Sequence, residues 1–207
     1  MNIILLSHIK KHIFPIYDKN DNAHNLEHIK YVIKRSIELC DGLDVNLDMV
    51  YVTAAYHDCG CYINRENHEI IAAKIFSKDE TIKKYFSSEQ IKVIKEAIED
   101  HRASLEYEPR SIYGKIVSSA DRNTSVEMSL KRSHDFQIKD NANKPLDVLV
   151  KNSYQKLNNK FGMGGYTKMY IKDQLYENYL KEMRSLLNDK NEFKKVYIKV
   201  NNIKMLK

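Results

Sequence analysis

Histidine and aspartate side chains occur in this sequence at positions where helical periodicity predicts apolar ones. The adjacent pair His57–Asp58 follows the apolar segment "AAY", and single histidines or aspartates extend the apolar faces of four other segments. A buried charge costs free energy unless it is paired, hydrogen-bonded or bound to a metal ion. If these side chains meet in one core, a divalent cation would supply the compensating charge. In chain order, the candidate ligands are His28, His57, Asp58, His68, His101 and Asp121.

The residue types restrict the metal. Neutral imidazole suits Zn, Fe, Mn, Co and Ni, while carboxylates shift the preference toward Mn or Mg. The sequence therefore predicts one or two divalent ions of this group. A single histidine on an apolar face is more often a hydrogen-bonded core residue, so the prediction depends on the convergence of all six side chains.

Four other residues are candidates for binding a phosphorylated substrate. Arg122 directly follows Asp121. Arg65 lies three residues before His68, and Arg102 directly follows His101. Arginine binds phosphate oxygens through paired hydrogen bonds. His24 precedes His28 by one helical turn and could line the entrance to the site. Each of the four could instead be a solvated surface residue, with Arg122 paired to a carboxylate such as Asp100.

The cysteines indicate neither a disulfide scaffold nor a zinc cluster. There are three, and Cys59 and Cys61 form a Cys-x-Cys far from Cys40. A structural zinc site needs about four ligands. We interpret Cys59 and Cys61 as small core or loop residues in a reducing compartment.

Helical periodicity recurs along the whole chain, which has only 6 glycines and 3 prolines. It predicts an all-α protein with no strands. In the third predicted helix, Leu47, Tyr51, Ala54 and Asp58 share one face. The segment 191–207 is compatible with a last helix or a short extended arm. Helices are predicted over about 2–14, 25–40, 46–57, 67–78, 88–101, 111–133, 145–160 and 168–187.

The order of the candidate ligands resembles the HD superfamily of metal-dependent phosphohydrolases, which is named for an adjacent His-Asp pair. The matching segments are "HNLEHIKYVIKRS" (24–36), "YHDCG" (56–60) and "SSADRN" (118–123). The resemblance covers about residues 20–135. It implies a helical bundle with a central metal site, and we expect a single HD-type domain over 1–207 with a C-terminal helical extension over about 145–207.

The resemblance also implies roles for the ligands. His28, His57, Asp58 and Asp121 would hold the first ion. His68 and His101 would hold a second ion bridged by Asp58, as in binuclear members. In the alternative, the site holds one ion, and His68 and His101 bind substrate phosphate or donate protons. Asp58, His68 and His101 are therefore also the candidate catalytic residues.

The expected activity is metal-dependent hydrolysis of a small phosphorylated substrate, such as a nucleotide or a related phosphoanhydride or phosphoester. The sequence shows no serine or cysteine nucleophile paired with a base, so covalent catalysis is not expected. Two alternatives keep the same ligands. One is a di-iron oxygenase of the same superfamily, and the other is a non-catalytic sensor that binds a nucleotide or metal.

Composition sets the remaining expectations. The chain has 207 residues, 43% of them hydrophobic and 30% charged, with a net charge of +6. A basic surface favours anionic partners, and we expect a lysine-rich solvated surface rather than a nucleic-acid site. No apolar run approaches the roughly 20 residues of a membrane span, and "MNIILL" is too short for a signal-peptide core. We expect a cytoplasmic protein without a membrane partner, and an oligomer is compatible with the sequence.

Overall fold

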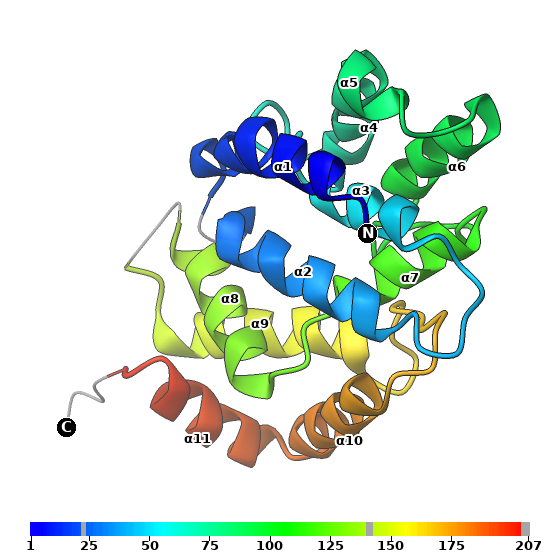
Figure 1. Ribbon diagram of the computed structural model, residues 1–207. Helices are drawn as coiled ribbons and strands as arrows, with labels where there is room; N and C mark the ends of the chain where they lie inside the picture. The colour runs from blue at the N-terminus through cyan, green and yellow to red at the C-terminus, as the bar shows by residue number, and fades with distance from the viewer. Residues whose placement is uncertain (22–23, 140–142, 204–207) are drawn as a thin grey trace. The chain divides into compact units, whose positions relative to one another are not determined.

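The computed structural model describes residues 1–21, 24–139 and 143–203, and within these ranges it contains helices and no strands. The predicted all-α class is confirmed. Figure 1 labels the helices. They are α1 (Ile3–His12), η1 (Phe14–Lys19), α2 (Leu26–Glu38), α3 (Leu47–Tyr56), α4 (His68–Lys78), α5 (Glu80–Lys83), α6 (Ser88–Glu99), α7 (Ile112–Ala120), α8 (Val126–Ile138), α9 (Leu146–Phe161), α10 (Gln174–Asn188) and α11 (Lys190–Val200).

The chain divides into two compact units. The first consists of residues 1–122 and 169–172, and the second of 123–168 and 173–207. The single HD-type domain with a helical extension from about residue 145 stays a prediction. None of the described helices is both long enough and apolar enough to cross a membrane.

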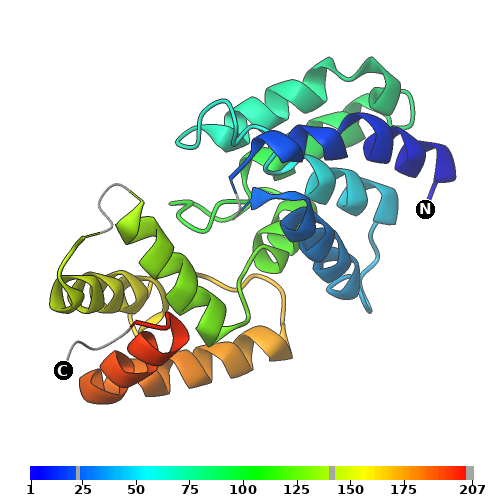
Figure 2. The same cartoon turned by 90° about the vertical axis from the view of Figure 1, so that its left-hand side faces the viewer.

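Helix α3 forms the centre of the first unit. Every residue from Met49 to Tyr56 is buried, and α1, α2, α4, α6 and α7 all contact this helix. Figures 1 and 2 show α3, in cyan, among these helices. The predicted single buried stripe is therefore too narrow, because α3 is buried on all sides along most of its length. Its first residue, Leu47, which we expected on that stripe, is 39% exposed.

The predicted helix over 111–133 is wrong, because the structure has two helices there. Helix α7 ends at Ala120, and Asp121 follows with φ −74° and ψ 4°. The Asn123 side chain then accepts a hydrogen bond from the Ser125 N–H (3.0 Å), and the Ser125 hydroxyl accepts one from the Met128 N–H (3.2 Å). Such local side-chain bonds compete with helix continuation and begin a new helix instead.

The predicted start of the helix over 168–187 is also too early. Residues 169–172 pack against α7, where the N–H groups of Tyr170 and Ile171 both lie 3.3 Å from the Ser119 hydroxyl oxygen. The Asp173 side chain then caps α10. The short helix α5 had no counterpart in the predicted set, since four residues are too few for a periodic signal.

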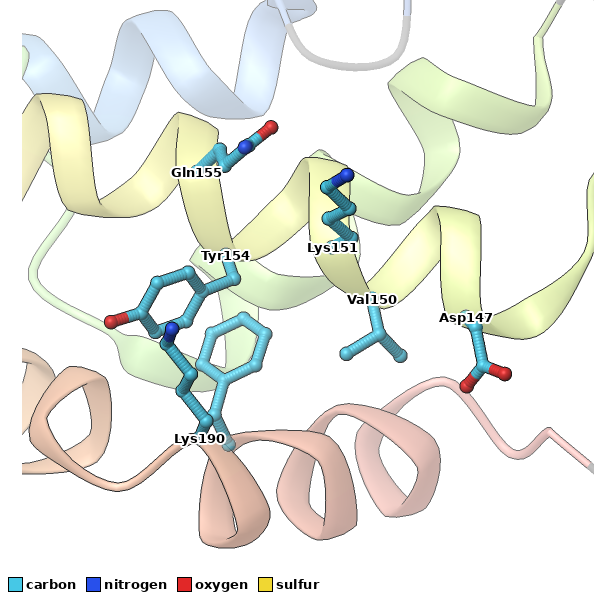
Figure 3. Close-up of a pocket in the computed structure, with 7 residues that line it drawn as sticks. Asp147, Val150, Lys151, Tyr154, Gln155 and Lys190 are labelled. Carbon is cyan, nitrogen blue, oxygen red and sulfur yellow. The ribbon is translucent and has the colours of Figure 1, made fainter.

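The second unit contains α8 to α11. Its core includes Leu157, Tyr179, Met183, Phe193 and Tyr197. Helix α11 shows that the C-terminal segment continues as a helix as far as Val200, while residues 204–207 lie outside the described part. A cavity of about 290 Å³ opens between α9 and α11, and none of the predicted site residues lines it. Figure 3 shows Tyr154 and Lys190 in this cavity.

Candidate metal centre

The six candidate ligands come from the ends of five helices in the first unit. His28 lies in the first turn of α2, and His68 is the first residue of α4. The other four directly or closely follow α3, α6 and α7. Helix ends suit a central site, because a side chain there can reach the core without a full turn of polar residues being buried.

One group of atoms surrounds Oδ2 of Asp58. His28 Nε2 lies 3.1 Å from Asp121 Oδ1 and 3.6 Å from Asp58 Oδ2. His57 Nε2 lies 3.3 Å from Asp58 Oδ2 and 4.0 Å from Asp121 Oδ1. Two nitrogens and two carboxylate oxygens therefore face one small volume, in the set expected for the first ion.

A second group surrounds the other oxygen of Asp58. His68 Nε2 lies 3.3 Å and His101 Nε2 lies 3.4 Å from Asp58 Oδ1. The two imidazole nitrogens are 3.1 Å apart. Asp58 is 2% exposed, and each of its oxygens faces a different pair of histidines. This is the arrangement that a bridging carboxylate requires.

Backbone carbonyls orient three of the imidazoles. The Nδ1 atoms of His57, His68 and His101 donate to the carbonyl oxygens of Ala54 (2.8 Å), Arg65 (2.9 Å) and Ile98 (2.7 Å). Each carbonyl lies three residues before its histidine. Because a carbonyl only accepts, Nδ1 carries the proton, and in the neutral ring Nε2 offers a lone pair to the centre.

The donor set fits a divalent cation. His68 Nε2 and His101 Nε2 lie 3.1 Å apart beside a carboxylate oxygen. His57 Nε2 is buried and has no hydrogen-bond partner among the described residues. An unsatisfied buried polar atom costs roughly 1–3 kcal/mol. A metal ion would satisfy these nitrogens and the carboxylates together.

The ionisable side chains also perturb one another strongly. Burial lowers the pKa of His28, but hydrogen bonds to Asp121 and Asp58 outweigh it and raise the pKa to about 9. Burial raises the pKa of Asp58, while the charge of His57 and a hydrogen bond from the protonated His28 hold it well below its usual range. Burial lowers the pKa of His101. The metal-free centre thus keeps Asp58 ionised beside a protonated His28.

Local structure positions two of the candidate ligands, His28 and His68. The Asn25 side chain caps α2 by accepting from the N–H of His28 (3.1 Å), which fixes that residue in the first turn. At Gly60, a Cβ atom would lie 2.4 Å from the carbonyl oxygen of His68 and 2.9 Å from the nitrogen of Ala72. The turn after Asp58 therefore approaches α4 more closely than any side chain at position 60 would permit.

We expect Gly60→Ala to displace the start of α4 and to weaken the second group more than the first. The unfolding free energy should fall by about 1–3 kcal/mol, as in other overpacked sites. Calorimetric titration with Mn²⁺ or Zn²⁺ would measure the loss of the weaker binding step. Gly164→Ala is the matched control, because a Cβ there meets no atom within 4 Å. Equal effects of the two substitutions would contradict the prediction.

A set of hydrogen bonds that the sequence did not predict lies next to His101. Asp100 is fully buried. It accepts hydrogen bonds from the Arg110 backbone N–H (2.8 Å), from Arg110 Nη2 (2.7 Å) and from the Tyr107 hydroxyl (3.1 Å). These bonds hold the 101–110 loop onto the end of α6. They also show that Asp100 pairs with Arg110, and not with Arg122 as the surface alternative proposed.

The candidate phosphate-binding residues lie in different surroundings. Arg65 and His24 both bind Asp21, and the His24 ring packs edge-on against His28 at 6.0 Å between centroids. Arg102 donates to the Glu66 carbonyl and to Glu69. Some of the donors of Arg65 and Arg102 are therefore already bound to acceptors within the protein.

Arg122 is 4% exposed, so it is not a surface residue. Its Nη2 donates to the Ser118 hydroxyl at 3.0 Å. Its Nε is buried and has no hydrogen-bond partner among the described residues. Of the four candidates, Arg122 is the one that adjoins a candidate ligand and retains a buried donor for a further acceptor.

Cys61, which we interpreted as a small core or loop residue, lies beside two of the candidate ligands. Potential ligand atoms of Asp58, Cys61 and His68 all lie within 4.8 Å of one another. Burial and the neighbouring charge of Asp58, together with a hydrogen bond to it, raise the pKa of the Cys61 thiol. The position three residues after Asp58 was the only available signal. Cys59, by contrast, is fully buried within the apolar core of the unit.

Comparison with known proteins agrees with this geometry. Residues 25–124 match the HD domain family, which confirms the predicted resemblance. HD domains bind divalent metals and belong to a superfamily of metal-dependent hydrolases that also has non-catalytic members.

One relative is an uncharacterized protein of Clostridium beijerinckii. It is 36% identical over 90 residues, which cover 41% of this chain and 57% of the relative. The match thus spans little more than half of that protein. No solved structure gives a significant match.

Proposed function

We propose that this chain is a metal-dependent phosphohydrolase that acts on a small phosphorylated substrate, such as a nucleotide or a related phosphoanhydride or phosphoester. The observation that carries the proposal is the position of Asp58, whose two oxygens face two separate pairs of histidines. A pair of divalent ions supplies an activated water and neutralises phosphoryl charge. His28, His57 and Asp121 would hold one ion, and His68 and His101 the other.

The residues around the ligands support an anionic substrate. The ionised Asp58 is a ligand at neutral pH without a proton to displace. Arg122 would bind a phosphoryl oxygen through its unused donor, and His24, Arg65 and Arg102 would bind the rest of the substrate near the entrance. This assignment places positive charge beside the centre, where a phosphate ester carries its negative charge.

The test is a hydrolysis screen of phosphate compounds with Mn, Mg, Co, Ni and Zn, paired with elemental analysis of the purified protein. Release of phosphate that depends on an added ion and is lost in Asp58→Asn supports the proposal. Oxygen consumption by an iron-loaded protein without phosphate release would indicate an oxygenase instead. Nucleotide binding without turnover under every metal would indicate a sensor.

We expect His68→Ala and His101→Ala to behave alike and to be less severe than His28→Ala. Both imidazoles belong to the second group, so each change should lower the metal content from about two ions per chain to one. Elemental analysis after dialysis measures this directly. An unchanged metal content with a raised Michaelis constant would assign both residues to phosphate binding and would contradict the binuclear site.

We expect Arg122→Lys to lower catalytic efficiency about 10- to 100-fold, with metal content unchanged. The planar guanidinium can bind an oxygen through two donors, which lysine cannot reproduce. A charge-assisted hydrogen bond of this kind is worth roughly 1.5–3 kcal/mol. Ser118→Ala is the control for orientation, because it removes only the hydroxyl that holds Nη2. Kinetics within about twofold of wild type for every substrate would remove Arg122 from the site.

A further inference from the structure

A sulfur atom that the HD signature does not account for, that of Cys61, lies close to two residues of the second group, Asp58 and His68. Asp58 and Cys61 lie in one turn, in which the Cys61 N–H donates to the Asp58 carbonyl at 3.1 Å. Gly60 lets this turn approach the start of α4, where His68 begins the helix. The thiol, the carboxylate and the imidazole therefore come to one place from two elements.

The separations suit one shared ion. The potential ligand atoms of Asp58, Cys61 and His68 lie within 4.8 Å of one another. Bonds of about 2.0–2.3 Å to a common metal hold two ligand atoms at most about 4.6 Å apart, so small side-chain rotations suffice. This position favours a cation independently of the thiol: with both Nδ1 atoms bound to carbonyls, the 3.1 Å contact between His68 Nε2 and His101 Nε2 requires either a proton or a metal ion between them.

We propose that Cys61 is a thiolate ligand of the second ion, together with Asp58 and His68, and that it directs this position toward Zn²⁺, Fe²⁺ or Co²⁺ rather than Mg²⁺. The inference rests on the metal centre of the proposed function and not on the hydrolytic reaction. When the sulfur–metal bond forms, the thiol proton passes to solvent. A soft sulfur donor favours these ions, whereas Mg²⁺ prefers sites built from oxygen donors alone.

The experiment is a titration of the metal-free full-length protein with Co²⁺. A thiolate bound to Co²⁺ gives a charge-transfer band in the near ultraviolet that imidazole and carboxylate ligands do not give. We expect this band in wild type as the second equivalent binds, and not in Cys61→Ser. Cys59→Ala is the matched control and should retain the band, because Cys59 is a core residue two positions away. In Cys61→Ser, affinity for Zn²⁺ at one position should fall roughly tenfold or more, with Mn²⁺ affinity changed much less.

A second measurement needs no variant. Cys61 is the most accessible of the three cysteines, since Cys40 and Cys59 are buried. Alkylation of the native protein, mapped by peptide mass, should modify Cys61 in the metal-free form and be slowed at least tenfold by Zn²⁺. Cys40 serves as the internal reference.

The outcomes separate the two proposals. Two bound cobalt ions without a thiolate band, a band that persists in Cys61→Ser, or alkylation unaffected by Zn²⁺ would overturn the cysteine ligand and leave the metal centre intact. The absence of any cobalt binding would overturn both. Cobalt binding with the band but without hydrolysis of any phosphate compound would retain the ligand and refute the phosphohydrolase.

Discussion

Asp58→Ala is expected to abolish tight metal binding and hydrolysis together. The carboxylate contributes one oxygen to each group of histidines, so its loss removes a ligand from both positions at once. It also removes the negative charge that offsets a bound cation. Elemental analysis and a phosphate-release assay would measure the two losses, and hydrolysis should fall to the level of the protein-free reaction.

A second variant, Asp58→Asn, keeps the shape of the side chain, removes the charge and should also lose hydrolysis. Helical content by circular dichroism should be largely retained in both variants, because the helices of the unit are held by apolar packing around α3. Full activity in a metal-loaded Asp58→Ala protein would refute the assignment of the site.

Metal affinity is expected to fall about 100-fold between pH 8 and pH 6. In the metal-free protein, His28 has a pKa of about 9, raised by Asp121 and Asp58 against the opposing effect of burial. The ring is therefore protonated at both pH values and must lose its proton to bind an ion. Each unit of pH below 9 costs about a factor of ten for this one proton. His57 and His68, whose pKa values are also raised against the opposing effect of burial by Asp58, act in the same direction.

Competition with a chelator of known affinity would measure this slope, and a pH indicator would count the protons released. At neutral pH at least one proton should be released per first ion bound, and the number should approach zero above about pH 10. Asp58 and Asp121 release none in this range, because their pKa values are held below the usual range. Affinity independent of pH between 6 and 8 would contradict the ligand role of His28.

The sequence was sufficient to locate the polar residues that interrupt apolar faces. His28, Asp58 and His101 each extend a helical face into the core, and periodicity detects such positions from neighbours in the same segment. The family resemblance then ordered them into two groups. Both steps use information that lies within a few turns of each residue.

Other features depend on contacts that a single segment does not encode. The approach of Gly60 to His68 becomes visible only when the turn and α4 are placed together. The pairing of Asp100 with Arg110, instead of Arg122, depends on how the 101–110 loop folds back. The place of Cys61 was not predicted for a different reason: its partners Asp58 and His68 are not cysteines, so the spacing of the cysteines alone does not reveal the group.

The placement of the ligands at helix ends has a thermodynamic consequence. The side chains of His28 and Asp121 lie 3.1 Å apart, although the two residues are far apart in the sequence. Because such a site forms only in the folded protein, an ion held by both would stabilise the native state by mass action. At a free concentration 100 times the dissociation constant, this amounts to about 2.7 kcal/mol. Melting temperature would then rank the candidate metals by affinity, with no knowledge of the substrate.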